Sequence, residues 1–253
     1  MFKKVLTTAV LSIMVFIFYP TSSFAYRPFS TEDAGVAGKG VAQFEVSWDY
    51  LKWKNKDKEN VFLFVPIYGI TENIELSVEI PYLFHSPAEG DRVDGIGDIN
   101  LVGKYLLINE GEKNPAFALK GVVKLNTGDY DKGLGSGDRD FSVFAVASKG
   151  FGNLTAHAQL GYTWVGDKRD ENLRNIYLYG LALDYGITET FHLVGEINGN
   201  RHPDRARAED PRNILLGVTY KLSEKFTFDF AIRRGLTTST PDWSTTTGVS
   251  ITF

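Results

Sequence analysis

The sequence predicts an all-β protein, a twelve-stranded antiparallel up-and-down barrel of the outer-membrane type. Three observations support this prediction: apolar and polar residues alternate along many short segments, the connections between segments are alternately short and long, and aromatic residues gather at segment ends. Alternation with a period of two is typical of strands that have one apolar and one polar face. In the last segment, 242–253, one face holds Trp243, Val249, Ile251 and Phe253.

The first 25 residues are expected to be removed before the chain folds. They combine Lys3 and Lys4, an apolar run over 5–18 and a small-x-Ala site that ends at Ala25, which is the pattern of a cleavable signal peptide. A retained anchor helix is the alternative, but about 18 apolar residues are normally needed to span a bilayer. Loss of the two lysines changes the formal net charge from −4 to −6.

Residues 26–39 have no useful periodicity, and we interpret them as an irregular periplasmic or lumenal leader. From residue 40 to 253, short alternating segments bounded by Gly, Asn, Asp and Pro predict the barrel. The expected strands are 41–53, 60–68, 73–84, 97–107, 115–126, 140–149, 154–165, 176–185, 190–199, 213–222, 226–234 and 242–253.

The connections decide which face of the strands points outward, because alternation alone would also suit a soluble lipocalin-like barrel or a sandwich. Turns after even-numbered strands are short, as at 69–72 and 150–153, whereas loops after odd-numbered strands are mostly longer and charged, as at 127–139 and 200–212. Short turns at one end and long loops at the other are typical of an outer-membrane barrel with both termini in the periplasm.

Aromatic residues at outward positions form two expected belts, as amphipathic rings do at both membrane interfaces. A preference of aromatic residues for strands would explain their number but not their clustering at strand ends. The belt at the loop end comprises Trp48, Tyr50, Tyr82, Phe84, Phe141, Tyr162, Trp164, Tyr177, Tyr179 and Trp243, and the belt at the turn end comprises Tyr105, Phe117, Tyr185, Phe191, Tyr220, Phe226 and Phe253.

If the apolar faces meet lipid, the polar faces line the lumen. Heights along neighbouring strands predict two cross-strand pairs, Glu75 with Lys104 and Asp98 with Lys124. Such charges either neutralise and brace the interior or select a passing solute by its charge, and the two roles are compatible. The candidate lumen-lining residues are Glu45, Asp49, Glu75, Glu79, Asp98, Lys104, Lys120, Lys124, Glu196, Asp229 and Arg233.

Catalytic and metal-binding patterns are weak. A Ser/His hydrolase needs its nucleophile and histidine side by side, but we expect His157 and His192 inside the barrel near the turn end, and His85 and His202 in loops. The acidic residues between 129 and 140 lack the order of a calcium loop. We therefore expect no catalytic residue, no metal and no cofactor, and the mildly acidic charge without a basic tract gives no sign of nucleic-acid binding.

The expected location is the outer membrane of a Gram-negative bacterium, so the first partner is membrane lipid. The arginines of the 201–212 loop are candidate contacts for lipopolysaccharide phosphates, although a solvated loop would have the same composition. Phe253, an aromatic residue carrying the terminal carboxylate, resembles the signal that outer-membrane barrels present to their assembly machinery.

Several sequence blocks occur in one order along the chain, at 27–34, 37–40, 95–99, 124–128, 133–137, 147–152 and 239–243. Taken together, they resemble one outer-membrane family, the meta-pathway phenol-degradation proteins. The resemblance implies a barrel that acts as a channel or facilitator for small molecules, aromatic or hydrophobic ones included. The alternatives are a non-conducting structural or surface-interaction barrel and, more distantly, an outer-membrane enzyme.

Overall fold

The structure is a computed structural model that describes residues 27–167, 172–206 and 209–253. The predicted signal peptide lies outside the described residues. Along these ranges the chain forms thirteen strands, whose bounds are β1 Ala42–Lys52, β2 Lys58–Gly69, β3 Ile74–Ser86, β4 Val93–Ile96, β5 Asn100–Ile108, β6 Ala116–Lys124, β7 Asp140–Phe151, β8 Leu154–Trp164, β9 Ile176–Gly186, β10 Phe191–Asn200, β11 Arg212–Lys221, β12 Phe226–Gly235 and β13 Trp243–Thr252.

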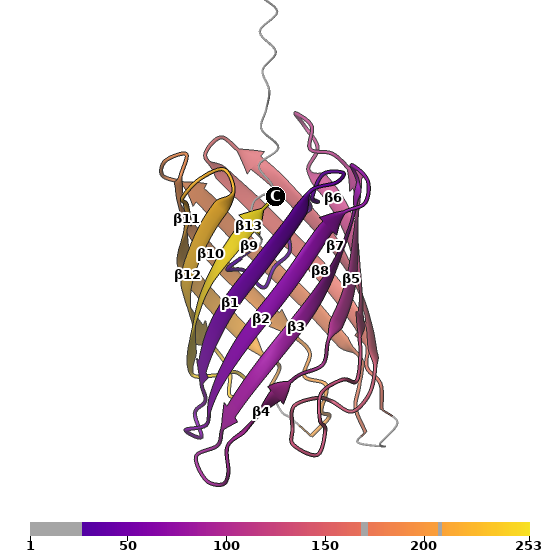
Figure 1. Ribbon diagram of the computed structural model, residues 1–253, viewed down its shortest axis with the longest axis vertical. Helices are drawn as coiled ribbons and strands as arrows, with labels where there is room; N and C mark the ends of the chain where they lie inside the picture. The colour runs from indigo at the N-terminus through magenta and orange to yellow at the C-terminus, as the bar shows by residue number, and fades with distance from the viewer. Residues whose placement is uncertain (1–26, 168–171, 207–208) are drawn as a thin grey trace, which may run out of the picture.

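The strands form one closed antiparallel barrel (Figure 1). Strands that are neighbours in sequence pair with each other, except β4 and β5, and β13 closes the ring by pairing with β1 from Thr252 opposite Gln43 to Trp243 opposite Lys52. Because β4 and β5 both pair with β3, the thirteen strands occupy twelve positions in the wall. The prediction of a twelve-stranded up-and-down barrel is confirmed.

One predicted strand is broken. Residues 97–107 were expected to be continuous, but the wall position is shared by β4 and β5, which leave 97–99 between them. The reason is that Asp98 turns its carboxylate to the loop at 125–139, where it accepts hydrogen bonds from Gly128 N at 3.0 Å and Ser136 N at 2.8 Å. The expected loop position of His85 is also wrong, since β3 extends to Ser86.

Apolar side chains cover the outside of the barrel, and polar and charged side chains are concentrated inside it. On β9, for example, the outward Leu181 and Leu183 are exposed whereas the inward Ala182 between them is buried. Along the described ranges, no helix is long and apolar enough to cross a membrane. The barrel has a short-connection end, which we call the turn end, and a long-connection end, which we call the loop end.

Rings at the loop end pack against one another in the predicted belt. Tyr162 lies with its ring centroid 4.8 Å from that of Trp164 and 5.0 Å from that of Tyr177. Across the closing seam, Tyr50 and Trp243 are 5.3 Å apart between centroids. Tilted and edge-to-face contacts of this kind are favourable for aromatic rings, so they stabilise the wall at the height where the strands leave the barrel.

Candidate functional site: the lumen and the leader

The leader, residues 27–39, runs inside the ring of strands (Figure 1, indigo). Its irregular backbone has N–H groups that no strand can satisfy, and buried N–H groups require acceptors. Inward side chains of the barrel supply them. These hydrogen bonds run from Ser30 N to Glu196 Oε1 at 2.9 Å, Thr31 N to Glu196 Oε1 at 2.5 Å, Glu32 N to Gln159 Oε1 at 2.9 Å, Ala34 N to Ser148 Oγ at 2.9 Å and Ala37 N to Glu75 Oε2 at 2.6 Å.

The first residues of the leader are also bound through side chains. The guanidinium Nε of Arg27 lies 3.4 Å from a carboxylate oxygen of Asp229, which is 1% exposed, and Arg27 also donates to the hydroxyl of Thr246. Arg233 donates to Ser30 Oγ at 3.0 Å. An ionic contact between two buried groups is costly to break on one side only, so Arg27 ties the leader firmly to β12.

The centre of the leader carries an ion cluster. Glu32 places Oε1 3.0 Å from Lys104 Nζ and Oε2 2.5 Å from Lys120 Nζ, so each carboxylate oxygen meets one ammonium group. Lys104 is also 3.0 Å from Glu75, and Lys120 is 3.7 Å from Glu79. Glu32 therefore joins the leader directly to β5 and β6, and through the two lysines the cluster extends to β3.

Two small apolar clusters complete the fit of the leader. Ala34 packs with Ala118 and Val146, which lie on the inner faces of β6 and β7. Phe29 packs against a second cluster on β10, β11 and β12 that consists of Val194, Leu215 and Ala231. The backbone of β9 passes close to the leader at Gly180, where an added Cβ would overlap the Thr31 hydroxyl.

A second charged cluster lies at the break between β4 and β5. Lys124 Nζ is 2.5 Å from Asp140 and 3.9 Å from Asp98, and it donates to Ser136 Oγ at 2.6 Å. Leu134, which is 4% exposed, comes against Gly95 of β4 and Gly97 directly after that strand. The 125–139 loop is therefore held against the inner wall.

Both cross-strand pairs expected from the sequence are present, Glu75 with Lys104 and Asp98 with Lys124. Of the remaining candidates, Glu45 accepts a hydrogen bond from Gln43 Nε2 at 2.8 Å, and Asp49 accepts one from Ser47 at 3.4 Å. Those two lie on β1, away from the ion cluster. The structure thus brings Glu75, Glu79, Lys104 and Lys120 together, Asp98 and Lys124 together, and Glu196, Asp229 and Arg233 onto the leader.

Sequence reasoning missed the partners that the leader itself contributes. Glu32 and Arg27 belong to a segment without periodicity, so no parity could place them inside the barrel. Gln159 and Ser148 stand at inward positions of β8 and β7, but they are uncharged, and nothing in the sequence distinguished them from other polar residues as candidate site residues. The sequence offered one signal for these contacts: the leader contains charged residues, and the inward faces of the strands contain charged residues with which they could pair.

The histidines do not assemble a reactive centre. His157 Nδ1 is 2.8 Å from Ser148 Oγ, and His192 Nδ1 is 2.6 Å from Asp184. The Ser148 hydroxyl also receives the amide of Ala34, which places it in the leader contact. Among the residues that the structure describes, no group of three or more His, Asp or Glu side chains could hold a metal ion.

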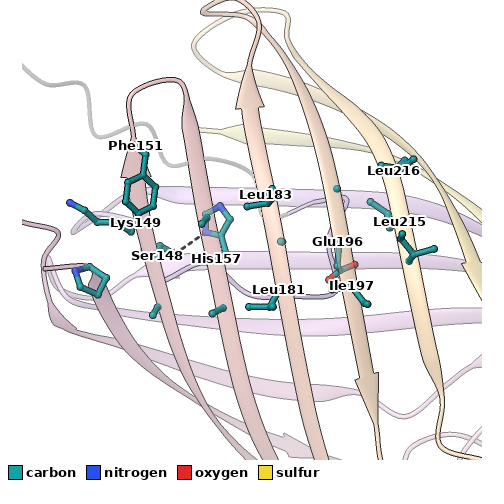
Figure 2. Close-up of a pocket in the computed structure, with 17 residues that line it drawn as sticks. Ser148, Lys149, Phe151, His157, Leu181, Leu183, Glu196, Ile197, Leu215 and Leu216 are labelled. Carbon is teal, nitrogen blue, oxygen red and sulfur yellow. Dashed lines mark hydrogen bonds between the residues drawn. The ribbon is translucent and has the colours of Figure 1, made fainter. Parts of the chain in front are cut away.

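A hollow of about 670 Å³ lies along β7 to β11 (Figure 2). It is lined mostly by outward residues, with Phe151, Leu181, Leu183 and Leu216 standing around small residues such as Ala147 and Ala158. Figure 2 shows the Ser148 and His157 side chains joined by their hydrogen bond beside it. The exposed lining is mainly apolar and suits the acyl chains around the barrel, and the inward residues Ser148 and Glu196, which bind the leader, border the hollow as well.

Solved structures with the same architecture are outer-membrane proteins. The chain is similar to the COG4313 outer membrane channel from Pseudomonas putida F1, with a TM-score of 0.72, 16% identity, and coverage of 89% of this chain and 100% of that one. It is also similar to the KdgM porin, with a TM-score of 0.56, 8% identity and coverage of 83% and 99%. For the CymD monoaromatic hydrocarbon channel the TM-score is 0.53, with 11% identity and coverage of 85% and 88%.

At these identities the likeness establishes the fold, an outer-membrane β-barrel. A search of curated proteins finds no significant match. The family model described as "Putative MetA-pathway of phenol degradation" matches residues 25–253, which is nearly the whole chain and includes every sequence block named above. The chain therefore belongs to that family.

Proposed function

We propose that this protein is an outer-membrane channel for small molecules, aromatic or hydrophobic ones included, and that the leader closes its lumen at rest. The observation that carries the proposal is the way in which the leader is held. The contacts described above between leader and wall are hydrogen bonds, ion pairs and small apolar contacts, and none of them is a strand-to-strand pairing, so the leader can leave without breaking the barrel.

The architecture supports passage of a solute. A barrel of twelve strands encloses more room than one of eight, whose side chains simply fill the interior. Here the space is occupied by a separate segment with polar contacts to the wall. The solved structures that resemble this chain include one named as a monoaromatic hydrocarbon channel, and the family is named for phenol degradation; both agree with an aromatic solute.

The main alternative is a non-conducting structural or surface-interaction barrel, with the leader as a permanent part of its core. The same contacts would then serve rigidity alone. An outer-membrane enzyme is a more distant alternative, since Ser148 contacts both His157 and the leader amide of Ala34, and His192 is hydrogen-bonded to Asp184 on the neighbouring strand.

Conductance separates the channel from the structural barrel. The mature protein and a variant that lacks residues 27–38 would be compared in planar lipid bilayers, after heat-modifiable migration on gels has confirmed that both are folded. We expect rare openings of the complete protein and a several-fold higher mean conductance of the shortened one. If both forms stay closed, the protein is a structural barrel and the channel proposal is wrong.

The proposal includes the environment. We infer that residues 1–25 direct export and are cleaved, that Phe253 is read by the barrel assembly machinery, and that the arginines of the 201–212 loop face lipopolysaccharide. Asp210 of this loop makes an ion pair of 3.7 Å with Arg174, which lies in the loop before β9. Part of the charge of the 201–212 loop is therefore neutralised within the protein. Impaired membrane insertion after deletion of Phe253 would support its role as the assembly signal.

A further inference from the structure

We propose that Lys104 and Lys120 form a binding site for the carboxylate of a small organic acid, and that Glu32 of the leader occupies this site at rest. The inference rests on the proposed function, because the acid must enter the lumen to reach the site. The inference extends the proposed function in two ways: it names a carboxylate as the group of the solute that the lumen recognises, and it gives binding of this group as the cause of leader release.

The first step in the argument is the register of β5 and β6. Lys104 and Lys120 stand directly opposite each other, and both are inward. Like charges at directly opposite positions destabilise a strand pair. Two ammonium groups held in this way require anions close by, and side-chain exposures of 5% and 16% show that little water reaches them.

The second step is the geometry of the group that neutralises them. The Glu32 carboxylate spans the two lysines with one oxygen on each, at 3.0 and 2.5 Å. Charge-assisted hydrogen bonds of this length are among the stronger polar contacts in proteins. The ammonium groups of Lys104 and Lys120 therefore form a site of the right size for one carboxylate, which we call the cradle. The carboxylate that fills the cradle belongs to the leader and not to the wall.

The third step is the balance of charge without the leader. The wall itself offers Glu75 at 3.0 Å from Lys104 and Glu79 at 3.7 Å from Lys120. Glu79 is shared, since it also accepts a hydrogen bond from Asn100 Nδ2 at 2.7 Å. Lys120 would therefore lose its shortest ion pair when Glu32 leaves, and a carboxylate from solution can take that place.

The surroundings of the cradle indicate the body of the acid. Phe144 stands opposite Lys120 on β7, with the Nζ atom 5.9 Å from the centroid of its ring. On the loop-end side, the next inward pair of β5 and β6 is Val102 with Val122. An aromatic carboxylate can place its charged group between the lysines and its ring against Phe144 and these valines, so benzoate is a suitable probe.

The leader and the acid would compete for one site. Glu32 is tethered, and a short tether corresponds to an effective concentration in the millimolar range. Binding of benzoate to the complete protein is therefore weakened by Glu32, and binding of benzoate should in turn favour release of the leader. This coupling is reciprocal by thermodynamic linkage.

Calorimetric titration of the purified mature protein in detergent tests the site. We expect Glu32→Gln to bind benzoate about tenfold more tightly than the wild type, because the tethered competitor is removed. Lys120→Met should abolish binding. Lys149→Met is the matched control, because Lys149 is an outward residue paired with Glu110 at the turn end, and it should bind as the wild type does. Benzamide, which has the same shape without the charge, should not bind.

Two results would overturn the inference. One is equal benzoate affinity for the wild type, Glu32→Gln and Lys120→Met; the other is absence of benzoate binding to folded Glu32→Gln, whose substitution lies outside the barrel wall. Hydrogen exchange of the leader provides a second readout, since benzoate but not benzamide should accelerate exchange of the 30–37 amides. A protein that conducts without binding benzoate contradicts only this inference, whereas one that binds benzoate and never conducts contradicts the channel proposal.

Discussion

The leader and the 125–139 loop both lie against the inner wall without being strands, yet the barrel holds them in different ways. The contacts of the loop are concentrated around the break between β4 and β5, where Asp98 accepts hydrogen bonds from the amides of Gly128 and Ser136 and Thr127 hydrogen-bonds to residues 97 and 99. The leader depends on acceptors from four strands, at Glu75 on β3, Ser148 on β7, Gln159 on β8 and Glu196 on β10, as the hydrogen bonds described above establish.

This difference matters for movement. A segment whose contacts are concentrated at one place in the wall is loosened when the central group of that place is lost, and it remains a local feature of neighbouring strands. A segment with anchors spread around the ring is released only when several are exchanged for other partners. Under the proposed function, the distributed contacts make the leader a stable closure, and a competitor at its central ion cluster weakens this closure without replacing the other anchors.

Removal of the loop anchor should have the largest effect. Asp98→Ala leaves two amides without their acceptor and removes one partner of Lys124, a loss of about 2–4 kcal/mol from the stability of the closed loop. We expect trypsin to cut after Lys132, whose side chain is 61% exposed, much faster than in the wild type. Asp131→Asn, at an exposed position in the same loop, should leave the rate unchanged; equal rates for all three proteins would mean that Asp98 is not the anchor.

Displacement of the leader by one added side chain should have an intermediate effect. In Gly180→Val the new side chain occupies the place of Thr31, and crowding of this kind costs about 1–3 kcal/mol. The expected result is faster hydrogen exchange of the 30–34 amides, measured by mass spectrometry, with the strands unaffected. Gly121→Val is the control, because Gly121 has open space around it. Unchanged exchange in Gly180→Val would show that the leader tolerates local loss of fit.

The sequence was sufficient to predict the wall, and the reason is physical. A strand with lipid on one side and a polar lumen on the other must alternate between apolar and polar residues. The alternation therefore placed Glu75 and Lys104 on the inward face, and their similar positions along neighbouring strands placed them side by side. The break at 97–99 depends instead on Asp98 meeting residues about 30 positions later in the chain. Glu32 depends on a path through the lumen that only the folded ring defines. Neither contact produces a repeating pattern in the amino-acid sequence.

Hydrogen bonds between Glu209 and Thr238 join two loops at the loop end, and we call this contact the tie. Loss of the tie should have the smallest effect of the changes considered. The Thr238 backbone amide and hydroxyl donate to Glu209 Oε2 at 2.7 and 2.8 Å, and these hydrogen bonds hold the pKa of Glu209 below its usual range. A lowered pKa means that the tie contributes fully above the ordinary pKa of a glutamate and is lost as the pH falls through the lowered value.

Exchange of the Thr238 amide should therefore be equally slow at pH 7 and at about pH 5, after correction for intrinsic rates, and should become faster only in more acidic solution. Glu209→Gln should remove this dependence on pH and leave conductance unchanged, because the tie is solvent-exposed and touches neither the leader nor Asp98. A change in conductance would instead mean that the outer loops are coupled to the leader. The comparison between concentrated and distributed contacts would then have to include a third segment.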